Sequence, residues 1–98
     1  MNTANLQLEG LYLAVAAVTA LLRDKGLLSA GEIDAALASA EVKATFDPAR
    51  PRELSASNVD AICFPLRLLR LANNASAEGR QLSFTELAVR VGETKPGH

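Results

Sequence analysis

Residues 20–37, which read ALLRDKGLLSAGEIDAAL, contain the end of one helix, a short turn and the start of the next helix. Gly26 can adopt the left-handed backbone conformation in which helices commonly end. Ser29 and Glu32 form a capping-box pattern, which predicts that a second helix begins there. Because only residues 26–28 link the two helices, we expect an antiparallel helical hairpin.

The helix before this turn is expected over about residues 5–25, and it carries an apolar seam. Leucine and valine recur at alternating spacings of three and four, which is the pattern of a helix that packs along another helix. The seam consists of Leu8, Leu11, Val15, Val18 and Leu22. We take these five side chains as candidate interface residues.

The helix after the turn is expected to run to about Lys43. Its predicted apolar face consists of Ile33, Ala36, Leu37 and Ala40. The carboxylates of Asp34 and Glu41 are expected to point away from this face, into solvent.

A third helix is predicted to begin near Ser57 and to be ended by Asn73, Asn74 and the polar stretch to Gly79. At 100° per residue its polar side chains share one arc of roughly 80°. They are Asp60, Cys63, Arg67, Arg70 and Asn74. An apolar face this wide has to be covered on more than one side, so we expect this helix to be the central packing element. We add Phe64, Leu68 and Leu71 to the candidate interface.

Pro65 lies beyond the first turn of this third helix. Proline has no backbone N–H and therefore removes one hydrogen bond from the helix interior. We expect either a kink near this position or two abutting helices, with Pro65 in the first turn of the second.

The last predicted helix begins at Ser83, which forms a capping box with Glu86, and ends at Gly92. Residues 45–56 are interpreted as a connector with one helical turn after Pro48. About residues 93–98 are interpreted as a flexible tail. Together these elements predict one all-α domain of four helices over residues 1–98.

The arginines offer a candidate contact for an anion or a partner protein. Arg67 and Arg70 are neighbours on one helix face, and Arg50 and Arg52 could join them from the connector. A guanidinium group suits phosphate and carboxylate alike. The preferred interpretation is that Arg67 and Arg70 are the solvated edge of a buried helix, with Cys63 half-buried beside them.

The composition excludes several classes of function. With one cysteine and one histidine, the chain has neither an internal disulfide nor a zinc cluster. The six glycines form no phosphate-binding loop. The uncharged run over residues 11–22 is shorter than the ~20 residues of a membrane span. We expect no enzyme activity, cofactor or membrane contact, and a soluble, cytoplasmic protein.

Two segments resemble parts of known families. Residues 83–92, SFTELAVRVG, resemble the helix that precedes the recognition helix in helix-turn-helix regulators, which implies DNA binding. The six residues that follow contain Pro96 and Gly97, so we expect no recognition helix there. Residues 20–37 resemble a helical segment near the N-termini of nitrile hydratase subunits. The cysteine-rich metal motif of those enzymes has no counterpart here, so this resemblance implies a helical hairpin and no hydratase activity.

The leading hypothesis for function is a non-catalytic protein–protein interaction module that acts as a homodimer, because the helices present more apolar surface than a small core can bury. Another protein is an alternative partner. A nucleic-acid-associated regulator is the second hypothesis, but the formal charge of −1 disfavours it. A small-ligand carrier or enzyme with a pocket between helices is the third.

Overall fold

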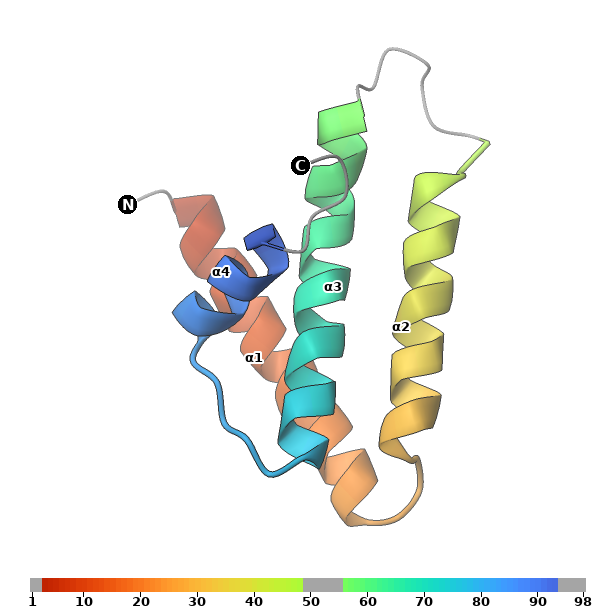
Figure 1. Ribbon diagram of the computed structural model, residues 1–98, viewed down its shortest axis with the longest axis vertical. Coiled ribbons are helices and arrows are strands. Elements are labelled where there is room, and N and C mark those ends of the chain that lie inside the picture. Colours follow the sequence, from red (N-terminus) through yellow and green to blue (C-terminus); the bar gives the residue numbers. More distant parts are fainter. Residues whose placement is uncertain (1–2, 49–55, 94–98) are drawn as a thin grey trace.

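The computed structural model describes residues 3–48 and 56–93, and within these ranges the chain forms four α-helices and no strand (Figure 1). The helices are α1 (Thr3–Asp24), α2 (Ala30–Thr45), α3 (Ala56–Ala77) and α4 (Phe84–Glu93). The predicted small all-α domain of four helices is confirmed. The helical turn expected after Pro48 lies outside the described residues, as do residues 94–98 of the expected tail.

α3 is the central helix of the domain. It packs against α2 most extensively, and also against α4 and α1. In Figure 1, α1 and α2 run in opposite directions on either side of α3. They reverse direction at the short turn over residues 25–29, as a hairpin would, but each of them packs on α3 rather than along the other.

Two glycines end helices by the same mechanism. Gly26 has a φ of 71°, and the N–H of Leu27 donates to the carbonyl of Leu22 at 3.0 Å. Gly79 has a φ of 79°, and the next N–H donates to the carbonyl of Ala75 at 2.8 Å. A residue with a side chain would be strained at this positive φ, so glycine ends both helices at little cost. The sequence predicted the first of these ends at Gly26 and the second within the polar stretch from Asn73 to Gly79.

Two capping boxes begin α2 and α4, as predicted. The backbone N–H of Glu32 donates to Ser29 Oγ at 3.1 Å, and the Ser29 N–H donates to Glu32 Oε1 at 2.9 Å. Ser83 and Glu86 exchange the same two bonds at 3.1 and 3.3 Å. Each box gives hydrogen-bond partners to backbone N–H groups that a helix start leaves unpaired.

α3 differs from the prediction at Pro65. It is one continuous helix across this residue, so the predicted break is wrong, whereas a kink stays a prediction. It extends to Ala77, within the polar stretch that was predicted to end it, and Gly79 supplies the end. In α4, similarly, Gly92 lies inside the helix rather than after it.

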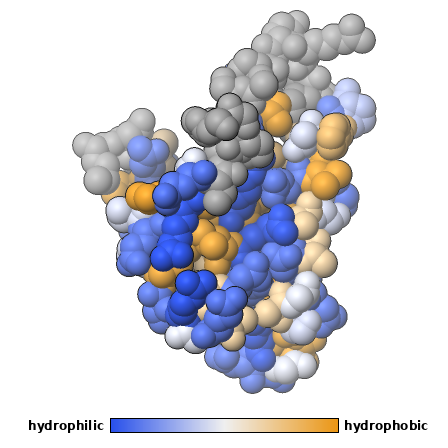
Figure 2. Space-filling model, in the orientation of Figure 1, coloured by the Kyte–Doolittle hydropathy of each residue, from blue (hydrophilic) through white to orange (hydrophobic). Residues whose placement is uncertain are grey.

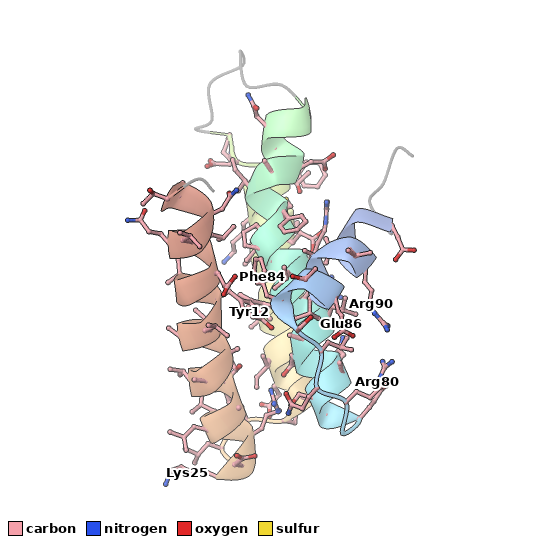
Figure 3. All side chains as sticks on the ribbon, turned by 90° about the vertical axis from the view of Figure 1, so that its left-hand side faces the viewer. Tyr12, Lys25, Arg80, Phe84, Glu86 and Arg90 are labelled. Carbon is pink, nitrogen blue, oxygen red and sulfur yellow. The ribbon has the colours of Figure 1, made fainter. Side chains whose placement is uncertain are left out.

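The core lies where α1, α3 and α4 meet. Its buried members are Tyr12, Leu68, Leu87 and Val91. The Tyr12 ring lies edge-to-face against Phe84, with the ring centroids 5.6 Å apart, and Figure 3 shows the two side chains between α1 and α4. Such a pair adds stabilisation beyond the apolar area that it buries.

α1 is only slightly covered by the rest of the chain. By length and composition alone its 22 residues could cross a membrane. Only 6% of its most apolar window is buried, so burial in the core does not account for its apolar composition. The uncharged run over residues 11–22 is only part of this helix, which begins at Thr3 and includes Glu9. One charge within an apolar helix does not end its apolar character, and the uncharged run therefore underestimated the length of this helix.

Candidate functional site

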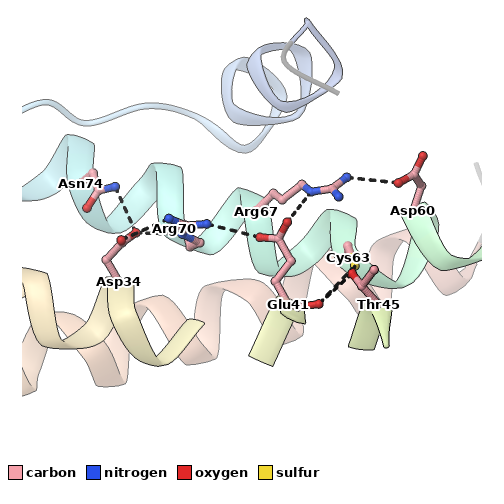
Figure 4. Close-up of polar contacts among 8 residues, drawn as sticks. All are labelled: Asp34, Glu41, Thr45, Asp60, Cys63, Arg67, Arg70 and Asn74. Atoms are coloured by element: carbon pink, nitrogen blue, oxygen red, sulfur yellow. Dashed lines mark hydrogen bonds and ion pairs between the residues drawn. The ribbon is translucent and has the colours of Figure 1, made fainter. Parts of the chain in front are cut away.

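The α2–α3 interface contains a network of ion pairs (Figure 4). Arg70 donates to both carboxylate oxygens of Asp34, at 2.9 and 3.2 Å. Arg67 donates to Glu41 at 2.9 Å and lies 3.5 Å from Asp60. Arg70 also contacts Glu41 at 3.4 Å, so that this carboxylate joins the two arginines.

The network corrects two predictions about these side chains. Asp34 and Glu41 were expected to point into solvent, but both face α3. They are seven residues apart and therefore lie on the same face of α2. Arg67 and Arg70 were expected to form a solvated edge. Their side chains are instead 20% and 36% exposed and are paired with carboxylates of α2.

The charges of the network leave no excess of positive charge at the arginines. Two guanidinium groups face three carboxylates, those of Asp34, Glu41 and Asp60. The hydrogen bond from Arg70 lowers the pKa of Asp34 below its ordinary value, and the carboxylates raise the pKa of both arginines. Arg50 and Arg52 lie outside the described residues. The described part of the predicted arginine contact therefore serves to join α2 to α3.

Cys63 is fully buried at this interface, with an exposed fraction of 0%, and was predicted to be half-buried. Its Sγ lies 3.5 Å from Thr45 Oγ1 and 3.9 Å from the carbonyl oxygen of Glu41. α2 covers this face of α3, which is why the polar arc of the helical wheel is not a solvated one.

The predicted interface residues separate into three groups. Leu68 is only 1% exposed and belongs to the core of this chain, so it is not available to a partner. Leu11 and Val18 are 64% and 58% exposed. The others are half-buried against the chain's own helices: Leu8, Val15, Leu22, Phe64 and Leu71.

A continuous apolar surface lies beside this seam, on the side of α1 that faces away from α3. We call it the outward face of α1, and it consists of Leu6, Gly10, Leu11, Leu13, Ala14, Ala17, Val18 and Leu21, all of them exposed. The seam lies across the boundary between this face and the core. Leu6, Leu13 and Leu21 were not among the predicted interface residues, although the scarcity of polar residues opposite the seam was the signal that could have identified them.

The domain also contains a cleft of about 290 Å³ between α1, α3 and the segment that leads to α4. About half of its lining residues are apolar, and Ala16, Ala20, Ala72 and Leu82 are among them. The sequence predicts a pocket between helices as one hypothesis but does not locate it. We refer to this feature below as the α1–α3 cleft.

A buried polar cluster lies at one end of the α1–α3 cleft. The Arg23 guanidinium donates to Asn73 Oδ1 at 2.6 Å and to Ser76 Oγ at 2.8 Å. Asn73 is 4% exposed and donates in turn to the carbonyl of Ala30 at 2.9 Å. These bonds connect the end of α1, the start of α2 and the last turns of α3.

The surface of the domain has distinct polar and apolar regions. In Figure 2 the face over α3, between α2 and α4, is mostly hydrophilic, in agreement with the ion pairs that it contains. A broad hollow of about 640 Å³ opens there, lined by Arg67, Arg70, Arg90 and Glu93 among others. Its lining carries both signs of charge.

Within residues 3–48 and 56–93, no three metal-ligating side chains come close enough to hold a metal ion. Comparisons with protein-family models, with curated proteins and with solved structures find no match to this chain. Inferences about its function therefore depend on its own surfaces.

Proposed function

We propose that this protein is a non-catalytic, cytoplasmic interaction module, and that it forms a homodimer in which the outward faces of two α1 helices pack together. The observation that carries the proposal is the exposure of this face. Five large apolar side chains are each more than half exposed: Leu6, Leu11, Leu13, Val18 and Leu21. A continuous exposed apolar surface of this kind commonly marks an interaction site.

The expected affinity follows from the surface that a dimer would bury. Full burial of a leucine or valine contributes about 1.5–3 kcal/mol, so side chains already half-buried would contribute about 1 kcal/mol each. Two copies of the face then supply roughly 10 kcal/mol, against an association cost of about 4–15 kcal/mol. At the low end of that cost roughly 6 kcal/mol remains, so we expect a weak dimer with a dissociation constant of roughly 40 µM or weaker.

Gly10 supports the choice of a second helix as the occupant. Glycine in a helix interior costs about 1 kcal/mol relative to alanine. A Cβ atom at Gly10 would meet nothing within 4 Å in this chain, so the fold itself does not require glycine there. Together with Ala14 and Ala17 on the same face, it would allow a second helix to approach closely.

Sedimentation velocity on the full chain between about 5 and 500 µM tests the proposal. We expect the weight-average mass to rise from monomer towards dimer over this range. Leu11→Glu and Leu21→Glu place charge on the outward face and should keep the chain monomeric. Val89→Glu is the matched control, because Val89 is 57% exposed on α4 and should leave the dimer unchanged.

A chain that stays monomeric up to the highest concentration contradicts the proposal. So does a dimer that both α1 variants leave intact. A membrane surface is the alternative occupant of the same face. If the chain stays monomeric but floats with phosphatidylcholine vesicles, and Leu11→Glu abolishes flotation, then the face binds lipid and the homodimer is wrong.

A further inference from the structure

We propose that the α1–α3 cleft is a binding site for an elongated amphipathic carboxylate, such as a medium-chain fatty acid, with the carboxylate at Arg23 and the apolar chain directed towards Tyr12. The cleft shares only Leu13 and Ala17 with the outward face of α1, and binding there does not require a homodimer. Its geometry combines a cationic end, an apolar middle and a polar far end.

The cationic end is a half-buried guanidinium that is not neutralised within the described chain. Arg23 donates only to the neutral groups of Asn73 and Ser76, and no described carboxylate forms an ion pair with it. A guanidinium group has five N–H donors, so three of them remain for a ligand. This differs from Arg67 and Arg70, whose charges are taken up by carboxylates of α2.

Asn73 and Ser76 hold this guanidinium in place before a ligand arrives. Asn73 is buried and is itself fixed by its bond to the carbonyl of Ala30. A charged donor that is already oriented loses little conformational entropy when it binds an anion. The fork of the guanidinium group matches the two oxygens of a carboxylate.

The apolar middle of the cleft suits a thin hydrocarbon chain. Ala16, Ala20 and Ala72 keep its walls low, and Leu69 and Leu82 add larger apolar surface. Tyr12 and Arg23 are eleven residues apart on α1, which corresponds to about 16 Å along the helix axis. An extended dodecanoate is of similar length.

Tyr12 marks the far end of the cleft. Its side chain is 8% exposed, yet its hydroxyl forms no hydrogen bond with any residue that the structure describes. Burial raises the pKa of this hydroxyl, so it is neutral at physiological pH. Because Tyr12 lines the cleft, a ligand or water there would supply a hydrogen-bond partner for this hydroxyl.

The second arginine of the cleft leaves the choice of an anion unchanged. Arg80 also lines this space, and its charge is paired with Glu78 at 3.1 Å. The positive charge of Arg23 therefore remains in excess among the residues that line the cleft. A cationic amphiphile of the same length would meet like charge and should be excluded.

Isothermal titration calorimetry with sodium dodecanoate, below its micelle-forming concentration, tests the site on the full chain. We expect saturable binding of one dodecanoate per chain. Arg23→Gln should weaken it at least tenfold, because the charge-assisted hydrogen bonds are lost. Ala20→Leu should weaken it at least tenfold by filling the cleft, and it leaves the bonds of Arg23 to Asn73 and Ser76 in place.

Two controls make the result specific. Lys25→Gln removes an exposed positive charge two residues from Arg23 and should change the affinity less than twofold. Dodecylammonium has the same chain with the opposite charge and should bind at least tenfold more weakly than dodecanoate. The proposal is overturned if dodecanoate shows no saturable binding, if dodecylammonium binds equally well, or if Ala20→Leu binds dodecanoate as the unchanged chain does.

Discussion

The two faces of α3 hold their neighbouring helices by different means. The face towards α2 is polar, and its arginines form ion pairs with Asp34 and Glu41 around the buried Cys63. The face towards α1 and α4 is apolar, and Leu68 at its centre is 1% exposed. Partly exposed ion pairs require particular partners, whereas apolar burial is not directional. We infer that the ion pairs fix how α2 sits on α3 and that the apolar face supplies most of the stability.

The expected magnitudes support this division. An ion pair between partly exposed side chains contributes about 0.2–1 kcal/mol, since solvent screens it. Complete burial of one leucine contributes about 1.5–3 kcal/mol. Substitutions on the apolar face should therefore cost clearly more than substitutions on the polar face.

Leu68→Ala should give the largest effect. Leu68 is among the most deeply buried large side chains, and its truncation leaves a cavity between α1, α3 and α4. We expect the free energy of unfolding to fall by about 2–5 kcal/mol, as measured by urea denaturation followed by circular dichroism. Val89→Ala, at an exposed position of α4, should change it by less than about 0.5 kcal/mol. A loss below about 1 kcal/mol for Leu68→Ala would contradict the division between the two faces.

Asn73→Ala should have the second largest effect, because Asn73 lies between the two faces and bonds to both neighbouring helices. Its loss leaves Arg23 with one partner fewer and removes the donor to the carbonyl of Ala30. We expect a cost of about 1–3 kcal/mol in urea denaturation. Asn74→Ala is the control, since Asn74 is exposed and its bond to Asp34 is 3.3 Å long. Equal losses for the two variants would show that burial of Asn73 contributes nothing.

The local features of the fold could be predicted from the sequence. The capping boxes at Ser29 and Ser83 and the left-handed Gly26 depend on residues within one helical turn of each other. The wide apolar arc of the third helix likewise predicted its central position. These signals are short in range, so a sequence pattern contains them completely.

The partners of each helix face could not be predicted in the same way. Arg67 and Arg70 form a narrow polar arc whether solvent or carboxylates cover it. Only the tertiary arrangement places Asp34 and Glu41 opposite them. The heptad seam of α1 shows the same limit, because α3 approaches from one side of the seam and leaves Leu11 and Val18 exposed. The direction from which a neighbour approaches is not contained in the period of one helix.

Gly10→Ala should produce a gain in stability. Position 10 lies on the outward face of α1, and a Cβ atom there would meet nothing within 4 Å. We expect the free energy of unfolding to rise by about 0.5–1 kcal/mol at protein concentrations where the chain is monomeric. Gly79→Ala is the matched control with the opposite sign, since its φ of 79° strains any side chain. A loss of stability in Gly10→Ala would mean that this position is covered within the monomer.

The pair of Asp34 and Arg70 should contribute less than any of these changes. A double-mutant cycle of Asp34→Asn and Arg70→Gln isolates their interaction. We expect a coupling free energy of about 0.2–1 kcal/mol, reduced by added salt, because the Arg70 side chain is 36% exposed. A coupling free energy above about 2 kcal/mol would mean that the polar face contributes as much to the stability as the apolar face.

The pH dependence of the same pair gives the smallest and most specific test. The hydrogen bond from Arg70 lowers the pKa of Asp34 in the folded chain below its ordinary value of 3.8. The folded state then releases this proton more readily than the unfolded state, so the stabilisation is complete above that value and is lost as the pH falls through the lowered pKa. We expect the difference in unfolding free energy between the unchanged chain and Asp34→Asn to be constant near about pH 6 and to decline below about pH 4. Arg70→Gln should remove most of this decline, because it takes away the group that lowers the pKa. If the decline is as steep in Arg70→Gln as in the unchanged chain, Arg70 does not hold Asp34 in its charged form.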